Sequence, residues 1–205
     1  MADLSGSLTG VHLRKHNPLM KQLNHYFVAG ALAAASVFAH ASPSDSPGFW
    51  TTPTIEGHGK MHNLPDGAFK PDANRNYKAV FSMSSGAAHP DEVNPALDHV
   101  ARAVNLFVAS GVPLKHLKFV AVAYGAATPL VLDDAHYRAA YGVPNPNLAV
   151  IAQLKKAGVV VAVCGQAVAE HHYEYDWIDS NVTLSLSGLT TVLTLQQAGY
   201  AYMPL

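Results

Sequence analysis

From residue 77 onward, short apolar runs alternate with longer segments in which apolar residues recur at helical spacing. Short continuous apolar runs are typical of strands that are buried on both faces of a sheet. They predict five strands, the last a short edge strand, at residues 77–83, 119–123, 159–163, 182–186 and 200–203.

The segments between these runs have the spacing and the end signals of helices. Leu97, Val100, Val104 and Phe107 recur every three or four residues, and Gly111 is a suitable C-cap for this segment. The other predicted helices span 133–141, the segment from an N-cap at Asn145 to the residues before Gly158, and 190–198.

The alternation of strands and helices predicts the fold class. Parallel strands that are joined by helical crossovers form sheets with helices on both faces. Residues 77–205 are therefore predicted to form one α/β domain around a mostly parallel sheet of about five strands.

Residues 1–41 have the layout of a secretory signal peptide. A short basic start after Met20 is followed by an apolar run at 27–38 and by Ala39-His40-Ala41. The apolar run, at about 12 residues, is too short for a membrane-spanning helix. We expect a periplasmic or secreted location in a bacterium, no membrane span after cleavage, and a translation start at Met20 rather than in the patternless residues 1–19.

Residues 42–76 are rich in proline and glycine, so they are predicted to form an extended arm without a helix or a long strand. Phe49 and Trp50 lie within this arm. An aromatic pair in a loop is expected to pack on the domain or on a neighbouring subunit.

The composition fits a single globular domain, because 49% of the 205 residues are apolar and 13% are charged. Removing residues 1–41 takes away three of the 13 basic residues and one of the 14 acidic ones, which changes the formal net charge from −1 to −3. This balance provides no positive surface for nucleic acid. The single cysteine excludes an intramolecular disulfide.

Candidate chemistry lies where the predicted strands end, because the carboxyl ends of parallel strands meet at one edge of a sheet. The residues at these ends are Ser84-Ser85-Gly86, Tyr124-Gly125, Cys164-Gly165-Gln166 and Ser187-Gly188. Cys164 would sit at the first turn of the next helix, where the helix dipole favours a thiolate. The alternative is that Cys164 is a small buried hydrophobic residue, as free cysteines often are.

No cofactor is expected. Ser84-Ser85-Gly86 lacks both the GxGxxG pattern and the lysine of a P-loop. His58, His62, His171 and His172 could contribute to a metal site, with or without Cys164, but they form no compact ligand motif. We therefore predict no metal site.

Six short segments between residues 77 and 205 form a recognisable combination. They are VCGQ at 163–166, PNPN at 144–147, LKKAGV at 154–159, EVNP at 92–95, TPL at 128–130 and QAGY at 197–200. Together they resemble the DsrE/DsrF-like sulfur-relay family, from about residue 77 to residue 205. The resemblance implies a flavodoxin-like, three-layer domain that assembles into trimers or hexamers. It also implies that Cys164 carries sulfane sulfur as a persulfide between partner proteins.

The predicted function is that of a sulfur-carrier or sulfurtransferase-like protein, which accepts sulfur on Cys164 and passes it to another carrier. Without a CxxC motif, the sulfur must be handed to a second molecule. The alternative is a non-catalytic, oligomeric module that binds a small ligand beside an inert cysteine. Besides Cys164, the predicted site residues are Gly165, Gln166, Tyr124, Gly125, Asn147 and Ser84.

Overall fold

The computed structural model describes Ser44 and residues 46–205, so the predicted signal peptide lies outside the described residues. Its centre is a five-stranded, all-parallel sheet with the strand order β4-β3-β2-β1-β5. The five predicted strands are confirmed, each within two residues of its expected ends. They are β1 (Tyr77–Met83), β2 (Leu117–Ala123), β3 (Val160–Cys164), β4 (Thr183–Ser185) and β5 (Ala201–Pro204).

Helices connect the strands in the predicted order. Residues Pro95–Ala109 form α1, whose first N–H groups are capped by the Asn94 side chain. Residues Asp134–Tyr141 form α2, which has Asp133 as its N-cap and ends at Gly142 with a left-handed φ of 76°. The remaining elements are η2 (Leu114–His116), η3 (Gly125–Val131), α3 (Leu148–Lys156), α4 (Gly165–Glu170), η4 (Tyr175–Trp177) and α5 (Gly188–Gln197).

Two helix starts differ from the prediction. Asn145 was expected to be the N-cap of the third helix, but α3 begins at Leu148 with Asn147 in the N-cap position. The side-chain oxygen of Asn145 instead accepts from the backbone N–H of Asn147, which forms a turn before the helix. The last helix begins two residues earlier than predicted because Ser187 accepts a hydrogen bond from Leu189 N–H and caps it.

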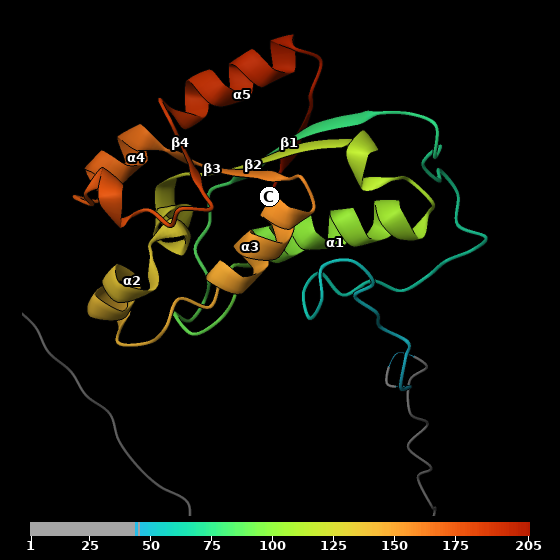
Figure 1. The fold of residues 1–205 in the computed structure, drawn as a ribbon, viewed down its shortest axis with the longest axis horizontal. Coiled ribbons are helices and arrows are strands. Elements are labelled where there is room, and N and C mark those ends of the chain that lie inside the picture. Colours follow the sequence, from blue (N-terminus) through green and yellow to red (C-terminus); the bar gives the residue numbers. More distant parts are fainter. Residues whose placement is uncertain (1–43, 45) are drawn as a thin grey trace, which may run out of the picture. The chain divides into compact units, whose positions relative to one another are not determined.

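The sheet separates two unequal layers (Figure 1). Side chains of alternate strand residues, such as Phe81 and Phe119, point into the main core with α1 and α3. Those of the intervening residues, such as Val80 and Val122, point to the other face, where Val192 of α5 packs on them. This is a flavodoxin-like, three-layer α/β arrangement.

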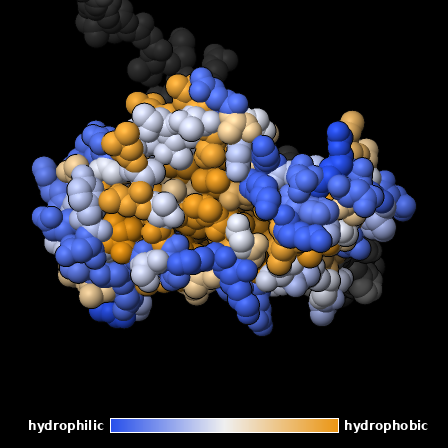
Figure 2. All heavy atoms as spheres, turned by 45° about the horizontal axis from the view of Figure 1, so that its top comes forward, coloured by the Kyte–Doolittle hydropathy of each residue, from blue (hydrophilic) through white to orange (hydrophobic). Residues whose placement is uncertain are grey.

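The face that carries α5 is incompletely covered. Figure 2 shows apolar residues gathered on this side of the molecule. Leu189 and Leu193 of α5 and Tyr202 of β5 are exposed on this side. Leu184 and Met203 of the edge strands are also exposed, but they pair with Val163 and Phe81 and so lie on the face of the main core, and Leu186 is exposed just after β4. Among the described residues, no helix is long and apolar enough to cross a membrane.

Residues 46–76, here called the arm, contain no helix, and their only strand-like pairing is a bridge between Thr51 and Met61. The arm nevertheless packs firmly on α1. Ile55 is 1% exposed and belongs to the main core. The buried side chain of Asn105 accepts from Thr54 N–H and Ile55 N–H, and it donates to the carbonyls of His58 and Gly59.

Within one chain, the aromatic pair of the arm contacts a histidine of the arm itself, and its packing on a neighbouring subunit stays a prediction. Phe49 stacks on His62 of the same arm with ring centroids 3.8 Å apart, and Trp50 meets Phe49 edge-on while remaining 50% exposed. A hydrogen bond between His62 Nδ1 and the Phe49 carbonyl fixes the stack. The side chains that reach the core are the aliphatic ones of Ile55 and Met61.

Candidate functional site

Three strands deliver side chains to one point at the carboxyl edge of the sheet. They are Ser82, one residue before the end of β1, Tyr124, which follows β2, and Cys164, the last residue of β3. All three occupy positions whose side chains point to the α5 face. The register pairs Ala123 with Val163, so Tyr124 and Cys164 follow at the same level of neighbouring strands. Alternation along the strands therefore brings these three residues together.

Cys164 ends β3 and is the N-cap of α4. Its Sγ atom accepts a hydrogen bond from the backbone N–H of Ala167 at 3.4 Å, and the residue is 7% exposed. The sulfur thus lies at the start of the helix with one backbone N–H as its hydrogen-bond donor.

Gly165 and Gln166 hold the turn after Cys164 in place. A Cβ atom on Gly165 would lie 2.8 Å from the carbonyl oxygen of Ser185, so only glycine allows α4 to start this close to β4. The side-chain amide of Gln166 donates to the carbonyl of Leu186. Both residues tie the first turn of α4 to the chain around β4.

Cys164 lies in the wall of a pocket with a volume of about 810 Å³. This pocket, here called the Cys164 pocket, opens between α4, α5 and the ends of β1, β2 and β5. It is large enough for a small organic molecule. The lining residues are Ser82, Tyr124, Gly125, Cys164, Gln166, Ala167, Glu170, Ser187, Gly188, Leu189, Val192, Leu193, Gln196 and Tyr202.

Tyr124 forms the floor of this pocket beside the cysteine. Its hydroxyl is hydrogen-bonded to that of Ser82, which is 3% exposed. Gly188, the first residue of α5, sits between the two side chains: a Cβ atom there would lie 3.3 Å from the Tyr124 ring and 3.6 Å from Cys164 Cβ. A glycine at this position keeps space open next to the sulfur.

The structure brings four of the predicted site residues together at the pocket wall, and Gly165 lies directly behind it. The other two lie elsewhere. Ser84 does not line the pocket; its carbonyl lies beside Gly125. Asn147 borders a separate cavity of about 160 Å³ and is 2% exposed.

Asn147 belongs to a network of three buried asparagines. Its side-chain oxygen accepts from Asn94 N–H, and its amide donates to the side-chain oxygen of Asn145. Asn145 in turn donates to the carbonyls of Leu130 and Leu132. The side-chain amide of Asn147 therefore makes its hydrogen bonds to neighbouring loops.

Several lining residues were not found from the sequence. Ser82 has the same position in the strand alternation as Tyr124 and Cys164, so the alternation could have identified it once the strands were aligned. The apolar wall from α5 had no signal of its own, because a buried helix face and a pocket wall have the same spacing. Glu170, at the last residue of α4, also lines the pocket.

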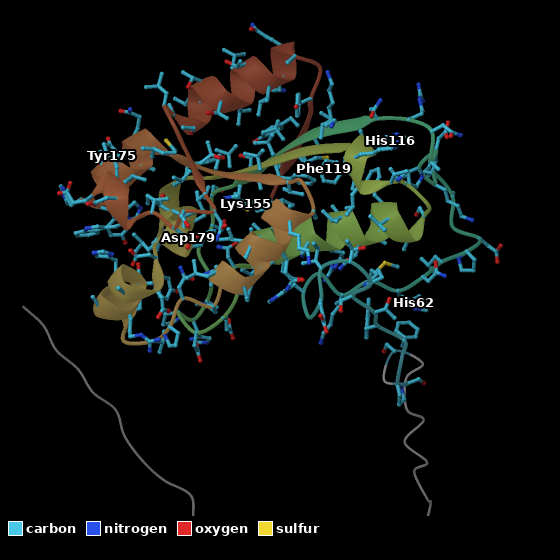
Figure 3. The ribbon with its side chains drawn as sticks, in the orientation of Figure 1. His62, His116, Phe119, Lys155, Tyr175 and Asp179 are labelled. Atoms are coloured by element: carbon cyan, nitrogen blue, oxygen red, sulfur yellow. The ribbon has the colours of Figure 1, made fainter. Side chains whose placement is uncertain are left out.

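The histidines do not gather around the cysteine. Figure 3 places His62 in the arm, on the opposite side of the view from Tyr175, which follows α4. His171 Nε2 donates to the Gly125 carbonyl, and the ring stacks on Tyr173. Over the residues described, no group of three or more His, Cys, Asp or Glu side chains could hold a metal ion.

Aromatic residues support the outer side of α4. Tyr173 is hydrogen-bonded to Tyr141, and burial together with this bond raises the pKa of Tyr173 above its ordinary value. Trp177 of η4 stacks on His136 of α2 with centroids 4.5 Å apart. The segment after α4 is thus anchored to α2.

A comparison with protein families identifies the family of this chain. Residues 77–205 match the DsrE/DsrF-like family along their whole length. The chain belongs to the DsrE/DsrF-like family. This is a sulfur-relay family, and in the present DsrE/DsrF-like chain the only cysteine lies at the carboxyl edge of the sheet.

Among solved structures, the DsrE/DsrF-like chain is similar to MTH1491 from Methanobacterium thermoautotrophicum, described as a protein of unknown function. The two share 18% sequence identity with a TM-score of 0.47, and the match covers 63% of this chain and 100% of the other. None of the curated proteins matches this chain.

Proposed function

We propose that this protein is a sulfur carrier that accepts sulfane sulfur on Cys164 and passes it to a partner. The observation that carries the proposal is the position of Cys164, whose Sγ accepts the Ala167 N–H at the wall of the Cys164 pocket. Membership of a sulfur-relay family supports the same role.

Two helices begin next to Cys164. The N-terminus of α4 begins at the cysteine, and the N-terminus of the longer α5 helix borders the same pocket through Ser187, Gly188 and Leu189. Helix N-termini carry a partial positive charge and stabilise anions nearby. A thiolate is the form of cysteine that attacks sulfur.

Sulfur transfer at this site needs no electron acceptor. The Cys164 thiolate attacks the outer sulfur of a donor persulfide, R–S–SH, the donor S–S bond breaks, and R–S⁻ leaves as Cys164–S–SH forms. An acceptor thiolate then attacks the outer sulfur of Cys164–S–SH and releases the Cys164 thiolate. Each step exchanges one S–S bond for another.

Intact mass spectrometry after incubation with inorganic polysulfide tests this proposal. Because the chain has one cysteine, a reductant-reversible gain of about 32 Da per sulfur must arise at Cys164, and Cys164→Ser must show none. No gain, together with slow alkylation of the thiol, would instead support the ligand-binding module with an inert cysteine, which the 7% exposure of Cys164 also permits.

We propose in addition that the carrier is exported and associates with copies of itself. The signal-peptide pattern of residues 1–41 supports export. The exposed apolar residues on α5, β4 and β5 support self-association, because monomers rarely expose such a surface. Its second partner would be another sulfur carrier that supplies or receives the persulfide.

A further inference from the structure

The walls of the Cys164 pocket are almost free of charge. Glu170 is the one charged residue among the described residues that line it. The other hydroxyl and amide groups of the lining are neutral and come from Ser82, Tyr124, Ser187, Tyr202 and two glutamines. The pocket thus offers no lysine or arginine to a strongly anionic molecule.

The helix N-termini compensate only part of an incoming negative charge. A helix N-terminus is equivalent to roughly half a positive charge, so α4 and α5 together provide about one at most. The Cys164 thiolate itself offsets that charge. A dianion would therefore find no positive charge left to pair with, and it would lie near the Glu170 carboxylate.

The side of the pocket formed by α5 is apolar. Leu189, Val192 and Leu193 lie on this helix, and Tyr202 adds an aromatic ring from β5. Leu189 is 85% exposed and Leu193 is 59% exposed, so these side chains have few neighbours within the chain. An apolar group bound in the pocket would remove this surface from water.

We infer that the compound that loads Cys164 is an organic sulfane-sulfur donor with an apolar substituent, and not the inorganic dianion thiosulfate. The inference rests on the proposed sulfur-carrier function. The apolar substituent would lie against Leu189, Val192 and Leu193, with the sulfane sulfur toward Cys164.

Two donors that transfer sulfur by the same displacement reaction, but differ in charge and polarity, distinguish an organic donor from an inorganic one. With benzenethiosulfonate, the thiolate attacks the outer sulfur, the S–S bond of the donor breaks, and benzenesulfinate leaves as Cys164–S–S⁻ forms. With thiosulfate, the same attack releases sulfite. Electron pairs and charge balance in both reactions, and neither needs an added oxidant.

The experiment measures the rate at which each donor adds one sulfur to the full chain, by mass spectrometry at low ionic strength. Each rate is divided by the rate of the same donor with free cysteine, because sulfinate is a better leaving group than sulfite. On this scale we expect benzenethiosulfonate to react faster than thiosulfate by a factor of about ten or more, because the dianion loses its hydration without gaining a cationic partner. Equal rates, or a faster reaction with thiosulfate, would overturn the inference.

Two variants test which residues cause the preference. Glu170→Gln removes the lining carboxylate and is expected to raise the rate of the reaction with thiosulfate by about two- to fourfold. Salt should reduce this effect because Glu170 is exposed. Leu189→Lys places a cation in the apolar wall and is expected to reduce the difference between the rates of the two donors further. The matched controls are Glu174→Gln and Leu64→Lys, which change exposed residues outside the pocket lining and are expected to behave as the wild type.

A neutral reagent separates failure of the inference from failure of the proposed function. Methyl methanethiosulfonate reports only whether the Cys164 thiolate is accessible. Persulfide formation with both donors, at rates that Glu170→Gln and Leu189→Lys leave unchanged, would overturn the donor preference and leave the sulfur carrier intact. Modification by the neutral reagent without persulfide from either donor would overturn the carrier function, and no modification at all would overturn both.

Discussion

Gly165 lies where a side chain has no room, because its Cβ position is 2.8 Å from the Ser185 carbonyl oxygen. We expect Gly165→Ala to force α4 and β4 apart and to lower the free energy of unfolding by about 1–3 kcal/mol, as other overpacking substitutions do. Urea denaturation followed by circular dichroism measures this change. An unchanged midpoint would show that the two backbones can separate without cost.

Gly188→Ala is the matched comparison. Its added methyl group would meet the Tyr124 ring at 3.3 Å, and a side chain can shift more easily than a backbone carbonyl. We expect the free energy of unfolding to change by less than about 1 kcal/mol. The alkylation rate of Cys164 by a bulky maleimide should fall, because the methyl group occupies the space between Tyr124 and the sulfur.

The carboxyl group of Asp133 makes the free energy of unfolding depend on pH. Partial burial raises the pKa of this carboxyl group, but hydrogen bonds from the backbone and the ring of His136 outweigh burial and hold the pKa below its usual range. A lowered pKa means that the stabilisation is complete above the unfolded value of about 3.9 and disappears as the pH falls through the folded value.

Asp133→Ala should therefore cost about 1 kcal/mol at pH 7, as expected for the loss of an N-cap. The difference from the wild type should narrow below about pH 4, where the wild-type carboxylate becomes protonated. Thermal unfolding of both proteins between pH 7 and pH 3 measures this. A difference that grows on acidification would contradict the assigned role of the carboxylate.

At the scale of elements, Asn105 of α1 holds the arm. Asn105→Leu would leave the N–H groups of Thr54 and Ile55 and the carbonyls of His58 and Gly59 without this partner. We expect a loss of about 2–4 kcal/mol in the free energy of unfolding, since several backbone groups lose their hydrogen bonds in or near the core. Limited proteolysis should then cut within residues 46–76.

Gln153→Leu is the control for this substitution. Gln153 of α3 makes a similar pair of hydrogen bonds to the backbone of Glu56, but in an exposed position. Water can replace these bonds, so the expected loss is below about 1 kcal/mol. Equal effects of the two substitutions would show that burial at Asn105 is not what fixes the arm.

The elements themselves could be predicted because their patterns are local. Continuous apolar runs gave all five strands, and Gly142 and Gly199 marked helix ends that the structure shows with left-handed φ values. The roles of Asn105 and Asn147 could not be predicted, because each depends on backbone groups that are distant in sequence. The contribution of Ile55 to the core is hidden for the same reason, since a lone isoleucine in a segment rich in proline and glycine has no periodic pattern.

At the scale of the site, sequence position was sufficient for Cys164, Tyr124 and Gly125, which follow strand ends directly. It was not sufficient for Glu170 or for the α5 wall, because their proximity to the cysteine depends on how α5 crosses the sheet. Ser84 and Asn147 follow or precede elements at the same edge, yet small differences in loop direction place them outside the Cys164 pocket.

At the scale of the whole molecule, we expect the proposed self-association to use the apolar residues that are exposed at the β4 edge of the sheet. Leu186→Glu should shift the protein toward monomer in light scattering after size-exclusion chromatography, because Leu186 is 74% exposed beside β4 without lining the Cys164 pocket. Leu64→Glu, a change of a similarly exposed leucine in the arm, should leave the mass unchanged. A monomeric wild type would contradict the proposal.

The burial of Ile55 also changes what counts as the unit that folds. The region shared with the family starts at residue 77, whereas the main core includes a side chain more than twenty positions earlier. A polypeptide cut at the family boundary would present to water the surface of α1 that Ile55 covers, and it would lose the backbone partners of Asn105. Cooperative unfolding of this protein should therefore include the arm, and the evolutionary boundary and the thermodynamic boundary of the domain differ.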